Sequence, residues 1–446
     1  MSVADQGRGK VRARSNVSGP TNDGRVVVLG CVALYLSLVA GWRALWGVDI
    51  WPWLGVPSGP SVFFDARNVA AAVECSRLGH DPLVDNPCDP WGRAMFYPRV
   101  WLALRWTGLE QGETLLFGAV IVTVFVLSLL LLLPRLSSAE GLVVAAAVCS
   151  PAVMFAVERA NMDLLIFSGL ALAAIVWRRG GAIAQYAAVG LVLLMAVAKL
   201  YPAVALLAFL PARRRDTAAV AGAALLVFGA YVVATRDDIA AISRTATQGQ
   251  YYSYGARILL GRVYHGVVGD EWGGNRALAQ GLVLLAVILL GVALWLVVGR
   301  GRPTGLRRRA HSSPRAPGSA PMHETADLIA FRMGALVYVG TFLFGNSFDY
   351  RLVFLLLVLP QLLRWPAPRE AAEALANPPR ATVAVVLLEL WIGTLSEQLR
   401  LWDEVVSWTL AGMLLVLLAR STPSIITVLR PSPHAPGRAS GTGPRT

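Results

Sequence analysis

Ser61–Trp101 reads SVFFDARNVAAAVECSRLGHDPLVDNPCDPWGRAMFYPRVW and lies between two long apolar runs. Asp65 is expected to open a short amphipathic helix that ends at Gly79, because glycine commonly caps a helix C-terminus. Four X-Pro steps follow, and the residue before each proline prefers an extended backbone. The stretch therefore predicts a juxtamembrane helix and a rigid, turn-rich polar loop beside a membrane-embedded core.

The composition of the whole chain is that of a polytopic membrane protein. Of its 446 residues, 56% are hydrophobic and 15% are charged, and the mean hydropathy is +0.57. The net charge of +13 could indicate a nucleic-acid partner. The arginines lie in short loops and tails, however, which is typical of cytoplasmic segments, so no nucleic acid is expected.

Counting apolar runs of roughly 20 residues predicts an all-α fold with about twelve transmembrane helices. The arginine clusters place both termini in the cytoplasm of a multi-pass plasma-membrane protein. The predicted divisions are a basic cytoplasmic tail (1–25), a transmembrane core (26–299) with outer loops (47–113 and 236–279), a disordered cytoplasmic linker (300–325), C-terminal transmembrane helices (326–420) and a disordered cytoplasmic tail (421–446).

Two of the four cysteines, Cys75 and Cys88, fall in the first outer loop. A disulfide can persist on that side of the membrane. The spacing alone leaves two states open, a bridge or two unpaired thiols.

Polar residues that are costly at membrane depth gather at predicted outer turns, which favours a site for an anionic, partly lipidic substrate. Each of these residues could instead have a purely structural role. Asp65 could cap its helix, Glu158 could pair with Arg159, and Lys199 could reach the head groups. No metal is expected, because the acids of the Asp-Pro steps read as turn residues. The candidate catalytic residue is Asp65, and the candidate substrate-binding residues are Arg67, Tyr97, Arg99, Glu158, Asn161, Asp163, Lys199, Tyr201, Asp349, Tyr350 and Arg351.

Three short motifs resemble glycosyltransferase family 87. They are an Asp after the first span followed by a helix and the Tyr97-Pro98 step, the run Glu158–Leu165 (ERANMDLL), and the run Ala198–Pro202 (AKLYP). The resemblance implies a GT-C fold. It also implies transfer of a sugar, typically mannose, from a polyprenyl-phosphate donor on the outer face of the plasma membrane, without a cofactor. The paired cysteines and the basic linker depart from that pattern and leave the acceptor, a lipid or a glycan, open.

This resemblance implies that Asp65 is the general base. The neighbouring Arg67 is expected to keep its carboxylate ionised. Glycosyl transfer also needs positive charge at the leaving phosphate. Lys199 and Arg351 are expected to supply it, with support from Arg99, Tyr201 and Tyr350. The alternatives are a transporter or flippase of a lipid-linked saccharide, which should show inverted repeats, and a non-catalytic assembly protein.

The charge pattern predicts that reporter fusions after Arg135 and Arg215 are cytoplasmic and that a fusion at Asn86 is external. A cytoplasmic signal at Asn86 would place Asp65 on the wrong side of the membrane for this chemistry.

Overall fold

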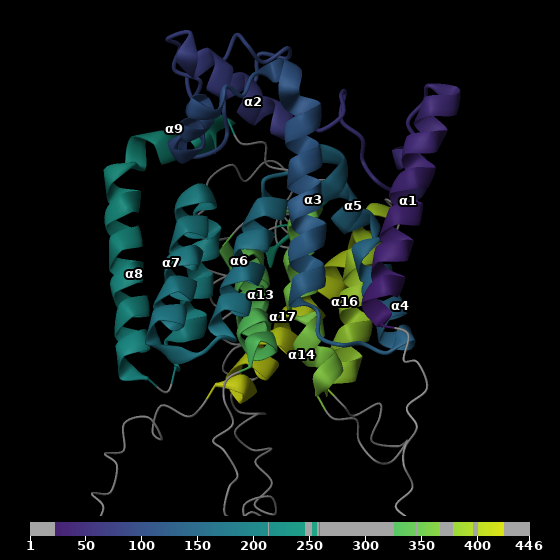
Figure 1. Cartoon of the computed structure of the whole chain (residues 1–446), viewed down its shortest axis with the longest axis vertical. Coiled ribbons are helices and arrows are strands. Elements are labelled where there is room, and N and C mark those ends of the chain that lie inside the picture. Colours follow the sequence, from purple (N-terminus) through teal and green to yellow (C-terminus); the bar gives the residue numbers. More distant parts are fainter. Residues whose placement is uncertain are drawn as a thin grey trace, which may run out of the picture.

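The protein is seen in a computed structural model (Figure 1). The structure describes residues 23–212, 214–245, 252–256, 258, 325–344, 347–365, 378–395 and 400–422. The expected span at 280–299, nearly all of the linker 300–325 and most of both tails lie outside these residues.

The chain is an all-α membrane protein with one small pair of strands. Six helices in the described ranges are long and apolar enough to cross a bilayer: α1 (Gly24–Trp46), α3 (Thr114–Leu132), α7 (Gly181–Lys199), α8 (Arg215–Ala234), α13 (Ala326–Phe344) and α17 (Arg400–Ser421). A seventh span is possible if α4 (Ser138–Val148) and α5 (Pro151–Arg159) count as one, although they are bent by 57°. Ser150 caps α5 with its side chain and Pro151 cannot continue the α4 hydrogen-bond ladder, which explains the bend.

The described residues hold six or seven candidate spans where twelve were predicted for the whole chain, one of them at 280–299 outside these residues. Several of the other predicted spans are interior segments instead. The runs near 202–212 and 352–364 fold as 3₁₀ segments, η4 (Tyr201–Phe209) and η5 (Asp349–Leu357), the latter followed by α14 (Leu359–Arg364). Nine residues of 3₁₀ helix rise roughly 18 Å, well short of a hydrocarbon core of about 30 Å. The predicted span at 163–177 is the short helix α6 (Asp163–Trp177).

The interior of the bundle is built around α13, which packs against η4, η5, α6 and α17. The hairpin of α16 (Pro378–Leu395) and α17 closes one side, and α6, α7 and α8 form the other (Figure 1). α1 packs mainly on α4, where Gly24 and Gly141 meet so closely that a Cβ on Gly141 would lie 2.5 Å from the Gly24 carbonyl oxygen. The outer half of α1 is left largely exposed.

One end of the bundle carries the polar elements. The predicted juxtamembrane helix is α2 (Phe64–Arg77), and it lies there with η1 (Trp51–Leu54), η2 (Arg99–Thr107), η3 (Gln111–Glu113) and α9 (Arg236–Thr245) (Figure 1). Strand β1 (Ser253–Tyr254) pairs antiparallel with β2 (Ser347–Phe348), so a second loop is joined to the start of η5. Three loops distant in sequence therefore meet above the bundle.

Gly118 on α3 leaves room for the ring of Phe63, the residue before α2. A Cβ at residue 118 would lie 2.1 Å from Phe63 Cδ2. We expect Gly118→Ala to displace Phe63 and to lower the free energy of unfolding by about 1–3 kcal/mol. Thermal unfolding in detergent measures the loss.

Gly190→Ala on α7 is the matched control, because outside its own helix no atom of the described residues lies within 4 Å of the added Cβ. It should be neutral or stabilising by up to about 1 kcal/mol. Equal effects of the two alanines would show that the contact with Phe63 does not hold α2.

Candidate functional site

The loop after α2 is covalently tied to that helix. Cys75 and Cys88 form a disulfide, with their Cα atoms 5.6 Å apart. Of the two states that the sequence left open, the bonded one is present. The bond closes a short loop and restricts the chain that follows α2.

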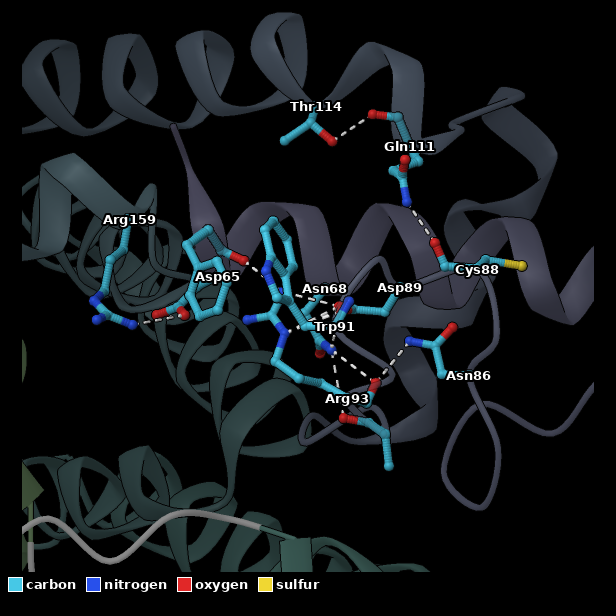
Figure 2. A network of polar contacts seen from close by, with 12 residues as sticks. Asp65, Asn68, Asn86, Cys88, Asp89, Trp91, Arg93, Gln111, Thr114 and Arg159 are labelled. Carbon is cyan, nitrogen blue, oxygen red and sulfur yellow. Dashed lines mark hydrogen bonds and ion pairs between the residues drawn. The ribbon is translucent and has the colours of Figure 1, made fainter. Parts of the chain in front are cut away.

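Arg93 joins the same loop to the first turn of α2 (Figure 2). Its Nη2 donates to Asp89 Oδ2 at 2.8 Å and to the Phe64 carbonyl oxygen at 3.0 Å, and its Cζ lies 3.6 Å from the centre of the Phe64 ring. Asn68 also donates to Asp89 Oδ2. Asp89 is thus neutralised by an arginine, and among the described residues no group of three or more His, Cys, Asp or Glu is placed to hold a metal ion.

The turn before α2 is bound to the end of α5. Phe63 adopts a left-handed backbone with φ 55°, which is uncommon for a bulky residue. Its N–H donates to the Glu158 carbonyl oxygen, and the N–H of Gly59 donates to Glu158 Oε1 at 2.8 Å. These contacts set the position of the first turn of α2, and with it Asp65.

Asp65 is buried, and its two carboxylate oxygens have different partners. Oδ1 accepts from Arg159 Nη1 at 3.3 Å (Figure 2). Oδ2 accepts from Asn161 Nδ2 at 2.6 Å. The ion-pair partner is therefore Arg159, which the sequence had paired with Glu158, rather than the predicted Arg67; Glu158 Oε2 lies 4.0 Å from Arg159 Nε.

Asn161 continues the chain of contacts to a buried ammonium group. Its Oδ1 accepts from Lys199 Nζ at 3.1 Å and from the backbone N–H of Asp163 at 2.9 Å. Asp163, fully buried at the start of α6, forms an ion pair with Lys199 and accepts from the Tyr201 hydroxyl at 2.6 Å. We call Asp65, Arg159, Asn161, Asp163, Lys199, Tyr201 and Arg351 the buried charge network.

Arg351 completes the network from η5. Its Nε lies 3.8 Å from Asp163 Oδ2, and its Nη1 donates to Ser347 Oγ at 2.8 Å. Two cations therefore face the single carboxylate of Asp163. That half of the network has one positive charge in excess, as a site for an anion requires.

Aromatic rings enclose the ammonium group of Lys199. Its Nζ lies 5.1 Å from the centre of the Tyr97 ring and 5.6 Å from that of Tyr350. Burial raises the pKa of Tyr97 well above its usual range, as does the Asp65 carboxylate to a smaller extent. The phenol stays protonated, and within the described residues its buried hydroxyl has no hydrogen-bond partner, so it is a donor available to a ligand.

The backbone is strained at two positions of the network. Ala160 (φ 42°) precedes Asn161, and Leu200 (φ 43°) follows Lys199. Non-glycine residues in this region cost on the order of 1–3 kcal/mol and cluster at functional sites. Both positions turn the chain sharply so that polar side chains from successive helices meet.

Two predicted site residues lie elsewhere. Arg99 donates to both carboxylate oxygens of Asp81, at 2.9 and 2.8 Å, and to Asp238 at the start of α9. This hydrogen bonding from Arg99 lowers the pKa of Asp81, so the pair of Asp81 and Arg99 within the first outer loop is ionic at neutral pH. Asp349 faces α16 and α17, since a Cβ on Gly393 would lie 3.0 Å from its Oδ2 and 3.1 Å from Asp403 Oδ1. Neither residue reaches the buried charge network.

Arg67 is half-buried on α2, and no described residue accepts a hydrogen bond from its buried Nε. Sequence reasoning left Arg159 out of the site residues. Its position in the motif ERANMD, two residues before Asn161 and four before Asp163, could have identified it as a site residue.

Comparisons of this chain with protein-family models, with curated proteins and with solved structures found no match.

Asp163 is the carboxylate that balances Lys199 and Arg351. Asp163→Asn should lower the free energy of unfolding by about 3–5 kcal/mol, because it leaves buried cations without a counter-ion. Lys199→Met added to it should restore part of that loss. Thermal unfolding in detergent measures all three proteins.

Asp237→Asn is the control, because the Asp237 side chain is 94% exposed. If Asp163→Asn unfolds at the same temperature as Asp237→Asn, the ion pair with Lys199 does not stabilise the bundle.

Proposed function

We propose that this protein is a membrane glycosyltransferase of the GT-C type. It would move a sugar, with mannose as the expected one, from a polyprenyl-phosphate donor to a lipid or glycan acceptor on the outer face of the plasma membrane. The observation that carries the proposal is the position of Asp65, a buried carboxylate that the Asn161 amide links to Lys199. Lys199 in turn shares the carboxylate of Asp163 with Arg351.

The reaction needs a base and an anion site, and the network offers both. Asp65 accepts the proton of the acceptor hydroxyl, and the hydroxyl oxygen forms a bond to the anomeric carbon of the sugar. The bond from that carbon to the phosphate oxygen breaks, and the electron pair leaves with polyprenyl phosphate. Lys199 and Arg351 stabilise the growing charge on the phosphate.

The location also favours a lipid-linked donor. The network lies where α5 and α7 end and where α6 and η5 begin, beneath the loops that α2 carries. The disulfide in those loops is typical of an oxidising, extracytoplasmic compartment. Exposed indoles of Trp46, Trp53 and Trp106 lie at the same end of the chain's spans, as at a membrane–water interface. A donor chain could therefore stay in the bilayer while its sugar reaches Asp65.

Asp65→Asn tests the proposal directly. Asparagine keeps the size of the side chain and an oxygen for Asn161, but it cannot accept a proton as a base. We expect a folded protein that still binds donor and whose turnover falls roughly 100-fold or more. The assay is transfer from radiolabelled polyprenyl-phosphate-mannose to a membrane lipid extract by the purified chain.

Asp85→Asn is the control, because the Asp85 side chain is 73% exposed in the same loop. Unchanged turnover in Asp65→Asn would leave Asp65 with only a structural role at the start of α2 and would contradict the mechanism.

A further inference from the structure

A pocket of about 350 Å³ lies between α1, α3 and α5. Ligand sites in proteins typically have volumes of about 300–1,000 Å³. Its walls are mainly apolar and aromatic, with Leu36 and Val39 from α1, Val122 from α3, Val157 from α5, and the rings of Trp51 and Phe63. Its volume and apolar lining fit part of a hydrocarbon chain.

The two charged side chains that line the pocket, Glu158 and Arg43, lie at the outer ends of α5 and α1. Glu158 lines it and is 5% exposed, and within the described residues its Oε2 has no hydrogen-bond partner. Such an orphaned buried oxygen costs free energy unless a ligand supplies a donor. Arg43 also lines the pocket, and its bond to Asp49 uses one nitrogen of a group with five N–H donors.

The order of residues along α1 sets the direction of an occupant. Arg43 is nearest the outer end, and Val39 and Leu36 lie one and two turns further into the bilayer. Leu38 on α1 and Leu116 on α3, both more than half exposed, present apolar surface beside the pocket. An amphiphile would enter from the bilayer with its charged head outward and its chain between the helices.

The two oxygens of Asp65 separate this pocket from the cation pair. Oδ2 leads through Asn161 to Lys199, which shares Asp163 with Arg351, and this is the side suited to the donor phosphate. Oδ1 leads through Arg159 to Glu158 and the pocket. The base deprotonates the acceptor hydroxyl while that oxygen attacks the anomeric carbon of the donor sugar. The base must therefore lie between acceptor and donor.

We infer that the pocket binds the acceptor, and that the acceptor is a phospholipid whose head group carries free hydroxyls. Its chain lies between α1 and α3, its phosphate meets Arg43, and a hydroxyl donates to Glu158. This inference rests on the proposed function for the role of acceptor. The pocket's preference for such a lipid is measured independently of sugar transfer.

The test is binding of phosphatidylglycerol, a simple phospholipid with free hydroxyls, to the purified full chain in detergent, read by native mass spectrometry. Ala119→Trp places an indole in the pocket from an exposed position on α3. It should weaken binding about tenfold, or by about 1.4 kcal/mol. Val120→Trp, on the neighbouring exposed position that does not line the pocket, should bind as the unaltered chain does.

Glu158→Gln is a second test, because it removes the carboxylate charge without filling the pocket. It should reduce the preference for phosphatidylglycerol over phosphatidylcholine, which has no hydroxyl and no net charge. Equal binding by the unaltered chain, Ala119→Trp and Val120→Trp would overturn the inference, and so would equal binding of the two lipids by the unaltered chain. Displacement of phosphatidylglycerol by polyprenyl phosphate would also overturn it, by assigning the pocket to the donor.

The same measurements distinguish failure of the proposed transferase function from failure of the lipid pocket. A chain that transfers no sugar but binds phosphatidylglycerol with the expected loss in Ala119→Trp has the lipid pocket without the transferase reaction. In a chain that does transfer sugar, Ala119→Trp should raise KM for the lipid acceptor and leave donor binding unchanged. An unchanged acceptor KM would refute the acceptor role alone.

Discussion

The side-chain amide of Asn161 is the contact on which the buried charge network depends. It donates to Asp65 and accepts from Lys199, and no carboxylate or ammonium group could do both. A carboxylate in its place would repel Asp65, and a cation would repel Lys199. The neutral amide therefore keeps a base and a cation close together without letting them form a direct ion pair.

The loops above the network restrict the motion of Asp65. The disulfide and the contacts of Arg93 hold α2 to the loop that follows it, and Phe63 ties the preceding turn to Glu158. An isolated short helix at a membrane surface would fray. Anchored at both ends, α2 presents the carboxylate at one height relative to the helices that carry Asn161 and Lys199. Preorganisation of this kind is what electrostatic catalysis requires.

The 3₁₀ geometry of η5 divides three consecutive polar residues between two environments. With three residues per turn, neighbouring side chains point about 120° apart. Asp349 consequently faces α16 and α17, while Tyr350 and Arg351 lie toward Lys199 and Asp163. Asp349 therefore belongs to a different part of the molecule from Tyr350 and Arg351, although the three are consecutive in sequence.

The sequence by itself determined the class of protein, the juxtamembrane helix and most of the network. Hydrophobic composition requires a membrane, and X-Pro steps and glycine act locally, so α2 and its loop could be predicted from neighbours in the chain. Asp65, Asn161, Asp163, Lys199, Tyr201 and Arg351 were identifiable because ionisable and polar groups at apolar turns are rare.

Only the tertiary structure decided which cation meets which carboxylate and which apolar runs cross the bundle. Arg159 rather than Arg67 pairs with Asp65, and Arg99 binds Asp81 and Asp238, because pairing depends on the approach of segments distant in sequence. Likewise η4 and η5 are as apolar as a span but are too short and are packed against α13 inside the bundle. Hydropathy measures how strongly a segment avoids water, and a protein interior satisfies that preference as well as lipid does.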